Sequence, residues 1–182
     1  MNFEPRTILL KDGRKCILRP THPDDSEQMI EYLKLTAAET PFVLRYPDEV
    51  TYTLESEREI LGQSLENKDT AMMVAVVDGI VAGNCAVNGV GNKRKILHRC
   101  SLGIALKKDF WGLGIGTEML TYAFELAKQI GYEQMELEVV CGNERAVRLY
   151  EKCGFCETGR HFRALKYDDG TYRDELIMSR LL

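Results

Sequence analysis

The sequence predicts a single domain of mixed α/β class, in which a central mixed, mostly antiparallel sheet is flanked by about four helices. Apolar strand-like runs meet at Asp12-Gly13 and at Asp78-Gly79, and these dipeptides favour tight hairpin turns between antiparallel strands. Two strand–helix units follow, and no repeat, linker or low-complexity segment divides residues 1–182. A length of 182 residues, 45% of them hydrophobic, suffices for one substantial core.

The first half of the chain predicts two hairpin strands, a helix, an aromatic connector and a second helix. The strands occupy 6–19, and Thr21 is expected to cap a helix over about 23–35 because acidic residues follow it near the positive end of the helix dipole. Residues 36–52 are aromatic and lack a clear period, which predicts a loop or a short helical turn, and a helix over about 53–67 follows. The residues that the two helices are expected to bury are Met29, Ile30, Leu33, Leu54, Ile60, Leu61 and Leu65.

The second half alternates strands with two amphipathic helices. Strands are expected over 71–79, 80–90 and 96–106. Apolar residues then recur at helical spacing to about residue 130, where Gly131 is well placed to end the helix. The remaining expected elements are a strand over 134–141, a helix over 144–153 and two closing strands around 168–170.

Composition and charge argue against several classes of protein. A formal net charge of −4 is unlike that of a basic nucleic-acid-binding domain, and no apolar run approaches the roughly 18 residues of a membrane helix. The first residues lack the pattern of a secretory signal, so a cytoplasmic protein is expected. Cys153 and Cys156 form a CxxC, but no second cysteine pair or histidine cluster completes a metal site, and no metal is expected.

Residues 109–117 place three alternating glycines between a strand and a helix. Glycine lets the backbone turn sharply and approach a ligand, and the free amides at a helix start favour an anion such as a pyrophosphate. The lysine of a P-loop is missing, since Thr117 and Glu118 follow the last glycine, and a dinucleotide motif would need glycine at Met119 or glycine or alanine at Thr117. ATP and NAD are therefore disfavoured as ligands.

Residues 143–155 form a second candidate segment. Asn143 suits a helix cap, and Tyr150 lies on one helical stripe with Ala146, Leu149 and Cys153. The spacing is compatible with Tyr150 as an ordinary core aromatic or as a catalytic phenol, and both interpretations stay open at this point.

These segments together resemble the GNAT superfamily of N-acetyltransferases. Residues 17–25 resemble its opening strand and helix start, 102–120 its acetyl-CoA motif, and 143–155 its second motif, N-x-x-A-x-x-L-Y-x-x-x-G-F. The likeness covers nearly the whole chain in the family's order. One departure is Trp111, where the family pattern usually has Arg or Gln.

The resemblance implies a GNAT-like sheet splayed in the middle, with acetyl-CoA as cosubstrate lying in the gap. It implies that backbone groups of β-strand residues hold the pantetheine arm, that amides of the glycine turn hold the pyrophosphate, and that an asparagine contacts the cofactor. The positions implied are Ile104, Ala105, Leu106, Gly112, Leu113, Gly114, Ile115, Gly116, Thr117 and Asn143.

The resemblance also implies an enzyme, an acyltransferase that moves the acetyl group to a primary amine by direct attack within a ternary complex. Tyr150 is the expected general acid for the leaving thiolate, and Glu138 is the leading candidate for the base. His98, Glu39 or an ordered water are the alternatives for the base, and a preorganised backbone N–H would stabilise the oxyanion.

The acceptor is less specified by the sequence. Residues 36–52 are expected to form its wall, with Phe42, Tyr46 and Tyr52 as apolar surface and Glu39, Asp48 and Glu49 as candidate partners of the ammonium group. The alternative is that these residues are a solvent-exposed connector. The expected acceptor is a small-molecule or peptide amine, and a homodimer is left open. The alternative function is a non-catalytic acyl-CoA-binding sensor of the same fold.

Overall fold

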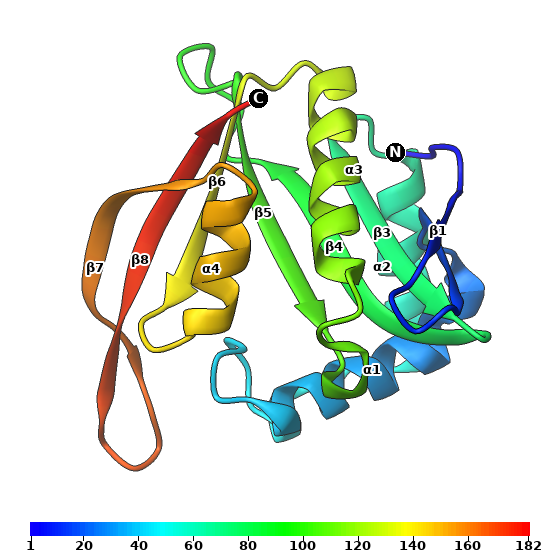
Figure 1. The fold of residues 1–182 in the computed structure, drawn as a ribbon, viewed down its shortest axis with the longest axis horizontal. Coiled ribbons are helices and arrows are strands. Elements are labelled where there is room, and N and C mark those ends of the chain that lie inside the picture. Colours follow the sequence, from blue (N-terminus) through cyan, green and yellow to red (C-terminus); the bar gives the residue numbers. More distant parts are fainter.

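One open eight-stranded sheet runs through the computed structural model, which describes residues 1–182 (Figure 1). Its spatial order is β1-β2-β3-β4-β5-β6-β8-β7, and every neighbouring pair is antiparallel except β5 and β6. The strands are β1 (Arg6–Leu9), β2 (Lys15–Pro20), β3 (Thr70–Val77), β4 (Ile80–Gly89), β5 (Arg99–Leu106), β6 (Gln134–Val140), β7 (Cys156–Lys166) and β8 (Tyr172–Leu181). The α-helices are α1 (Ser26–Glu39), α2 (Leu54–Glu66), α3 (Ile115–Ile130) and α4 (Glu144–Lys152). The predicted mixed fold with four helices is confirmed.

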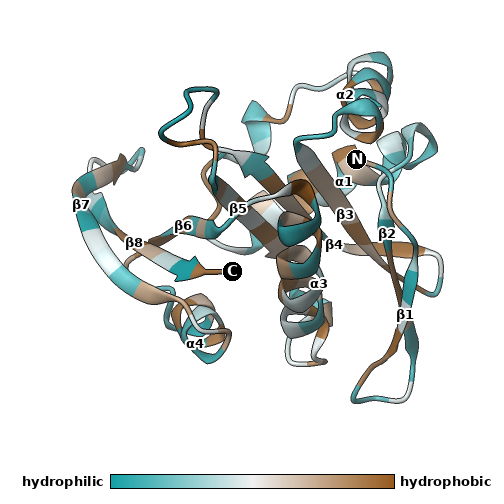
Figure 2. Cartoon of the chain, turned by 90° about the horizontal axis from the view of Figure 1, so that it is seen from above, coloured by the Kyte–Doolittle hydropathy of each residue, from teal (hydrophilic) through white to brown (hydrophobic).

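Helices cover both faces of the sheet because the apolar residues of its central strands alternate. On β3, Met73 and Ala75 join the large core that includes α3, whereas Val74 joins a smaller core with Tyr32 of α1 and Leu61 of α2. Figure 1 shows α3 and α4 on the near face with α1 and α2 behind, and in Figure 2 the hydrophobic colour is concentrated on the central strands. No helix has both the length and the apolar character that crossing a membrane requires.

The two parallel neighbours, β5 and β6, separate after three residue pairs. They pair only from Arg99 to Ser101 on the β5 side. Beyond that point β5 stays paired with β4 as far as Leu106, and β6 stays paired with β8 as far as Val140. The sheet therefore forks at the carboxyl ends of these two strands, which is the splay that the resemblance implied.

The start of α1 differs from the expected one. A 3-10 turn over Pro23–Asp25 precedes the helix, and His22, not Thr21, accepts a hydrogen bond from the first turn. The Thr21 hydroxyl is instead 3.0 Å from that of Ser64 on α2. The helix also continues to Glu39, four residues beyond the expected end. Thr36 and Ala37 in this added turn are buried, so the turn is part of the packed helix.

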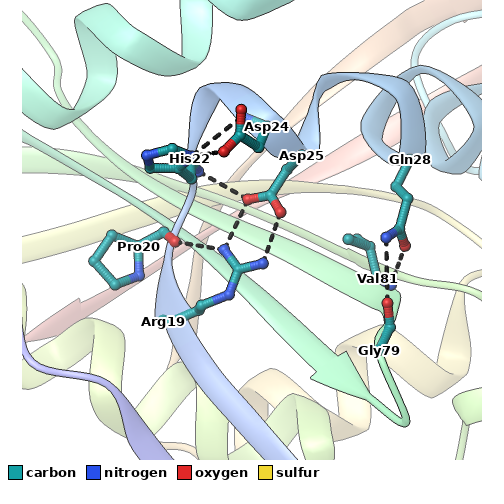
Figure 3. Close-up of polar contacts among 8 residues, drawn as sticks. All are labelled: Arg19, Pro20, His22, Asp24, Asp25, Gln28, Gly79 and Val81. Carbon is teal, nitrogen blue, oxygen red and sulfur yellow. Dashed lines mark hydrogen bonds and ion pairs between the residues drawn. The ribbon is translucent and has the colours of Figure 1, made fainter.

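A partly buried ion pair holds this turn against the sheet (Figure 3). Arg19 of β2 donates two hydrogen bonds, at 2.7 and 2.6 Å, to the carboxylate of Asp25, which also accepts from the His22 N–H at 2.8 Å. Further along α1, the side chain of Gln28 bonds the Gly79 carbonyl and the Val81 N–H at the β3–β4 turn. Side-chain contacts with β2 and with the β3–β4 turn therefore fix the position of the start of α1.

Three other expectations on the elements are wrong in whole or in part. On α2, Leu54 and Ile60 are 50% and 39% exposed, whereas Leu61 is buried, because the buried stripe of this helix runs through Glu57 and Leu61. The third strand of the second half begins at Arg99, since residues before it form turns. The connector 36–52 is a loop only from residue 40, with one 3-10 turn over Pro47–Glu49.

We expect Asp25→Asn to lower the free energy of unfolding by about 2 kcal/mol at pH 7, since the partly buried Arg19 would lose its charged partner. Burial alone would raise the pKa of the Asp25 carboxyl, but hydrogen bonds from Arg19 and His22 outweigh it and lower the pKa below 3.8. The stabilisation is therefore present above pH 3.8 and is lost as the pH falls through the folded-state pKa.

Urea unfolding at several pH values measures this difference. Asp24→Asn is the matched control, because the Asp24 side chain is 84% exposed and pairs only with the exposed His22. Equal losses for the two variants at pH 7 would contradict the assignment.

Candidate functional site

Backbone groups of β5 point into the fork. The Lys107 N–H donates to the Ala82 carbonyl of β4, whereas the His98 carbonyl accepts from the Gln134 N–H of β6. Successive residues of a strand direct their backbone groups to opposite neighbours, so odd-numbered residues of β5 face β4 and even-numbered ones face β6. Ile104 is even-numbered and lies beyond the last β5–β6 pair. Its N–H and carbonyl are therefore directed into the gap.

The two neighbours of Ile104 that were expected to hold a ligand are already engaged. The Ala105 carbonyl accepts the buried Tyr32 hydroxyl at 2.9 Å. The Leu106 carbonyl accepts the indole N–H of Trp111 at 2.9 Å, which gives this unusual tryptophan a structural role. Of these three residues, only Ile104 has backbone groups that are directed into the gap and has no side-chain donor bound to its carbonyl.

The glycine turn directs backbone amides toward the same region. Gly112 and Gly114 have φ values of 81° and 99°, which favour glycine, and α3 begins directly after them. A Cβ at Gly114 would meet no protein atom within 4 Å, so that side of the turn is open. Gly116 differs, since its Cβ would lie 3.1 Å from a Leu149 methyl. This glycine lets α4 pack on α3, a role that the sequence did not indicate.

A first cavity of about 550 Å³ joins the glycine turn to the fork. Of the predicted residues, Ile104, Ala105, Leu106, Gly112, Gly114, Gly116, Thr117, Asn143 and Tyr150 line it. Ile115 is fully buried in the core, and neither it nor Leu113 lines this cavity. The Asn143 side chain accepts from the Ala146 N–H at 3.3 Å, as the predicted helix cap.

Three cations that sequence reasoning missed also line the first cavity: Lys11, Arg145 and Arg148. The Arg145 guanidinium lies 4.7 Å from the centre of the Trp111 ring and would be 3.7 Å from a Cβ at Gly112. No periodic signal distinguishes these residues from other surface cations. They are brought together only because the β1–β2 turn, the glycine turn and α4 meet at this cavity.

A second cavity of about 700 Å³ lies on the other side of the fork, between α1, the loop after it and the ends of β5, β6 and β8. Its charged lining residues are Arg45, Glu136, Glu138 and Glu175. It shares eight lining residues with the first cavity: Thr36, Phe42, Val43, Ile104, Ala105, Asn143, Ala146 and Tyr150. The two cavities therefore meet at the fork.

Tyr150 of α4 lies where the cavities meet. The residue is 8% exposed, packs edge-on against Phe155 with ring centres 5.9 Å apart, and makes no hydrogen bond to a protein atom through its hydroxyl. Burial, with a smaller contribution from Cys85, raises the pKa of this phenol well above its usual value. Tyr150 is therefore both a core aromatic and a neutral hydrogen-bond donor at the cavity boundary.

Among the candidate bases, Glu138 alone lines the second cavity. Its carboxylate lies 3.4 Å from Nδ1 of His161 and close to Glu175, whose pKa is raised by burial and then by the Glu138 charge. Glu39 accepts the Lys108 N–H at 2.8 Å, which fixes the end of α1. His98 precedes β5, at the paired end of the fork, and lines neither cavity.

The expected acceptor wall is partly present. Phe42 lines both cavities, but the Tyr46 hydroxyl accepts the Asp168 N–H of the β7–β8 turn, and Tyr52 lines neither cavity. Glu49 accepts the Tyr46 N–H, and neither it nor the exposed Asp48 lines a cavity. Of the connector, only Thr36 and residues between Thr40 and Arg45 border the two cavities.

The model of the Acetyltransferase (GNAT) family matches residues 22–155, well over half of the chain. The chain belongs to the GNAT family of acetyltransferases. The matched residues include the β5 fork, the glycine turn and all of α4, so the resemblance inferred from the sequence is confirmed.

Individual relatives agree with this assignment. An N-alpha-acetyltransferase of Sulfurisphaera tokodaii is 29% identical over 164 residues, which cover 85% of this chain and 89% of that protein. The GNAT acetyltransferase structure from Streptococcus pneumoniae has a TM-score of 0.86 at 26% identity, over 92% of this chain and 99% of that one. A Salmonella typhimurium structure with its cofactor acetyl-CoA has a TM-score of 0.80 at 16% identity, over 92% and 94% of the two chains.

We expect Gly114→Val to abolish binding of coenzyme A while the protein stays folded. A side chain would occupy the open side of the turn and oppose its positive φ. Isothermal titration with coenzyme A measures the affinity. Gly79→Val is the matched control, because Gly79 also has a positive φ and open space but lies in the β3–β4 turn. Unchanged affinity in Gly114→Val, or an equal loss in both variants, would contradict the site.

Proposed function

We propose that this GNAT protein is an acetyl-CoA-dependent N-acetyltransferase that moves an acetyl group to a primary amine by direct attack in a ternary complex. The observation that carries the proposal is the meeting of two cavities at the fork, with the open backbone of Ile104 and the hydroxyl of Tyr150 at their boundary. Two cosubstrates bound in the two cavities would have their reacting groups adjacent there.

The residues of the first cavity suit acetyl-CoA. Backbone amides at the start of α3, beside the open Gly114, provide donors for a pyrophosphate, and the cations Lys11, Arg145 and Arg148 provide positive charge. Ile104 offers strand-like backbone groups that an amide-containing arm can pair with. The Salmonella typhimurium neighbour with acetyl-CoA supports this choice. When bound, acetyl-CoA supplies the acetyl thioester.

Residues of this chain would remove the proton from the amine, stabilise the oxygen that gains charge and protonate the leaving sulfur. An alkyl amine with a pKa near 10.4 must lose a proton before its nitrogen attacks the thioester carbon, and Glu138 in the second cavity accepts it directly or through water. As the C–N bond forms, the Ile104 N–H donates to the carbonyl oxygen that gains charge. As the C–S bond breaks, the Tyr150 hydroxyl gives its proton to the departing sulfur, and the second proton that the attacking nitrogen loses restores the Tyr150 hydroxyl.

We expect Tyr150→Phe to lower kcat by about 10²-fold, the effect of removing one general acid. The affinity for coenzyme A should change little, and so should the melting temperature, because the hydroxyl bonds no protein atom and the ring is kept. Release of thiol from acetyl-CoA with an accepted amine measures kcat. An unaltered kcat would remove Tyr150 from the mechanism, and an equal loss of cofactor affinity would make its role one of binding.

We expect Glu138→Gln to lower kcat/KM by about 10²-fold at pH 7 and to recover part of this loss as the pH is raised toward 10. The fraction of free amine rises with pH, so a missing base matters less there. Glu157→Gln is the control, because Glu157 is exposed on β7 and lines neither cavity. A loss that is the same at every pH would indicate binding instead of proton removal.

A further inference from the structure

The second cavity carries opposite charges on different walls. Its acidic residues come from the sheet: Glu136 and Glu138 from β6, and Glu175 from β8. Arg45, in the loop after α1, is its only basic lining residue. A ligand that contacts both walls must therefore carry a positive and a negative group.

Arg45 has no carboxylate partner in the protein. It forms none of the ion pairs, and its polar contact is a 3.4 Å approach of Nη1 to the Tyr52 hydroxyl. Its charge reaches the buried Glu57 of α2, where it opposes the rise in pKa that burial causes, but the two side chains are more than 4 Å apart. The guanidinium therefore keeps donors for a planar anion.

The acidic wall has a free carboxylate as well. Glu136 is bound by Arg99 with hydrogen bonds of 3.1 and 2.5 Å, and Glu138 pairs with His161. Glu175 lies beside Glu138 on the neighbouring strand and has no ion pair. The Tyr150 hydroxyl, which bonds no protein atom and is accessible from the cavity, lines the same cavity and marks where the reacting amine must lie.

The loop that carries Arg45 is tied to the β7–β8 hairpin. The Tyr167 hydroxyl donates to the Pro41 carbonyl at 2.8 Å, and the Asp168 N–H donates to the Tyr46 hydroxyl at 3.0 Å. These two bonds anchor the loop on both sides of Arg45, at Pro41 and at Tyr46. The second cavity that Arg45 lines has a volume of about 700 Å³, which is that of a small-molecule site.

Resting on the proposed function, we infer that the acceptor is a small zwitterionic amine, a free amino acid or close analogue. Arg45 binds its carboxylate, and Glu138 and Glu175 bind its ammonium group next to the fork. Arg45 is thereby a specificity-determining residue, because it separates free amino acids from amines that lack a carboxylate.

The test uses the full chain with acetyl-CoA and three sets of acceptors: the common L-amino acids, their carboxamides, and short peptides with the same first residues. Thiol release gives kcat and KM for each. We expect at least one free amino acid to exceed its carboxamide and its peptide in kcat/KM by about tenfold or more, the effect of one charge-assisted contact. We expect Arg45→Met to raise KM for that acid by a similar factor and to leave the carboxamide unchanged.

Two variants separate recognition from a structural role of Arg45. Arg45→Lys should restore part of the preference for the acid, and Arg58→Met, on the exposed face of α2, should leave it intact. The inference would be overturned if carboxamides or peptides had the same kcat/KM as the free acids, or if Arg45→Met lowered kcat/KM equally for all acceptors. Either result would leave the N-acetyltransferase proposal standing. No acetylation of any acceptor would overturn the proposed function itself.

Discussion

The candidate site depends on one constraint in the sheet, the loss of pairing between β5 and β6 after Ser101. Each strand remains hydrogen-bonded along its other edge, β5 to β4 and β6 to β8, so the backbone groups facing the gap need other partners. The Trp111 indole N–H donates to the Leu106 carbonyl, and the Asn143 N–H donates to the Val140 carbonyl. The backbone N–H and carbonyl of Ile104 remain without a strand partner, so an extended ligand can form hydrogen bonds with them.

The fork also explains how one chain holds two cavities of opposite charge. The first cavity has the start of α3 and three cations, which attract a polyanion, whereas the sheet side of the second carries three glutamates, which attract a cation. Because the cavities share residues around the fork, such ligands would approach each other at Ile104 and Tyr150. A continuous sheet with the same side chains would keep them apart.

Local patterns predicted the elements, but long-range contacts decided their limits. The Asp-Gly turns, the glycine turn and the amphipathic stripe of α3 depend on neighbouring residues, and the sequence was sufficient for them. The start of α1 depends on the pair of Arg19 with Asp25, and the packing of α4 on α3 depends on Gly116 beneath Leu149. The same limit applies at the site, because no spacing rule indicates that Ala105 and Leu106 are engaged while Ile104 is open.

The hydroxyl of Tyr150 is difficult to explain by folding alone. Its ring packs with Phe155 in the core, where phenylalanine would supply the same contacts, and its hydroxyl bonds no protein atom but is accessible from the cavity. Burial keeps the group neutral, as the raised pKa indicates, so it can donate a hydrogen bond but cannot add negative charge at the fork. A neutral donor in a site of low polarity stabilises an anion formed beside it more strongly than it would in water. The position of Tyr150 thus favours a reaction in which negative charge appears at the fork and is removed there.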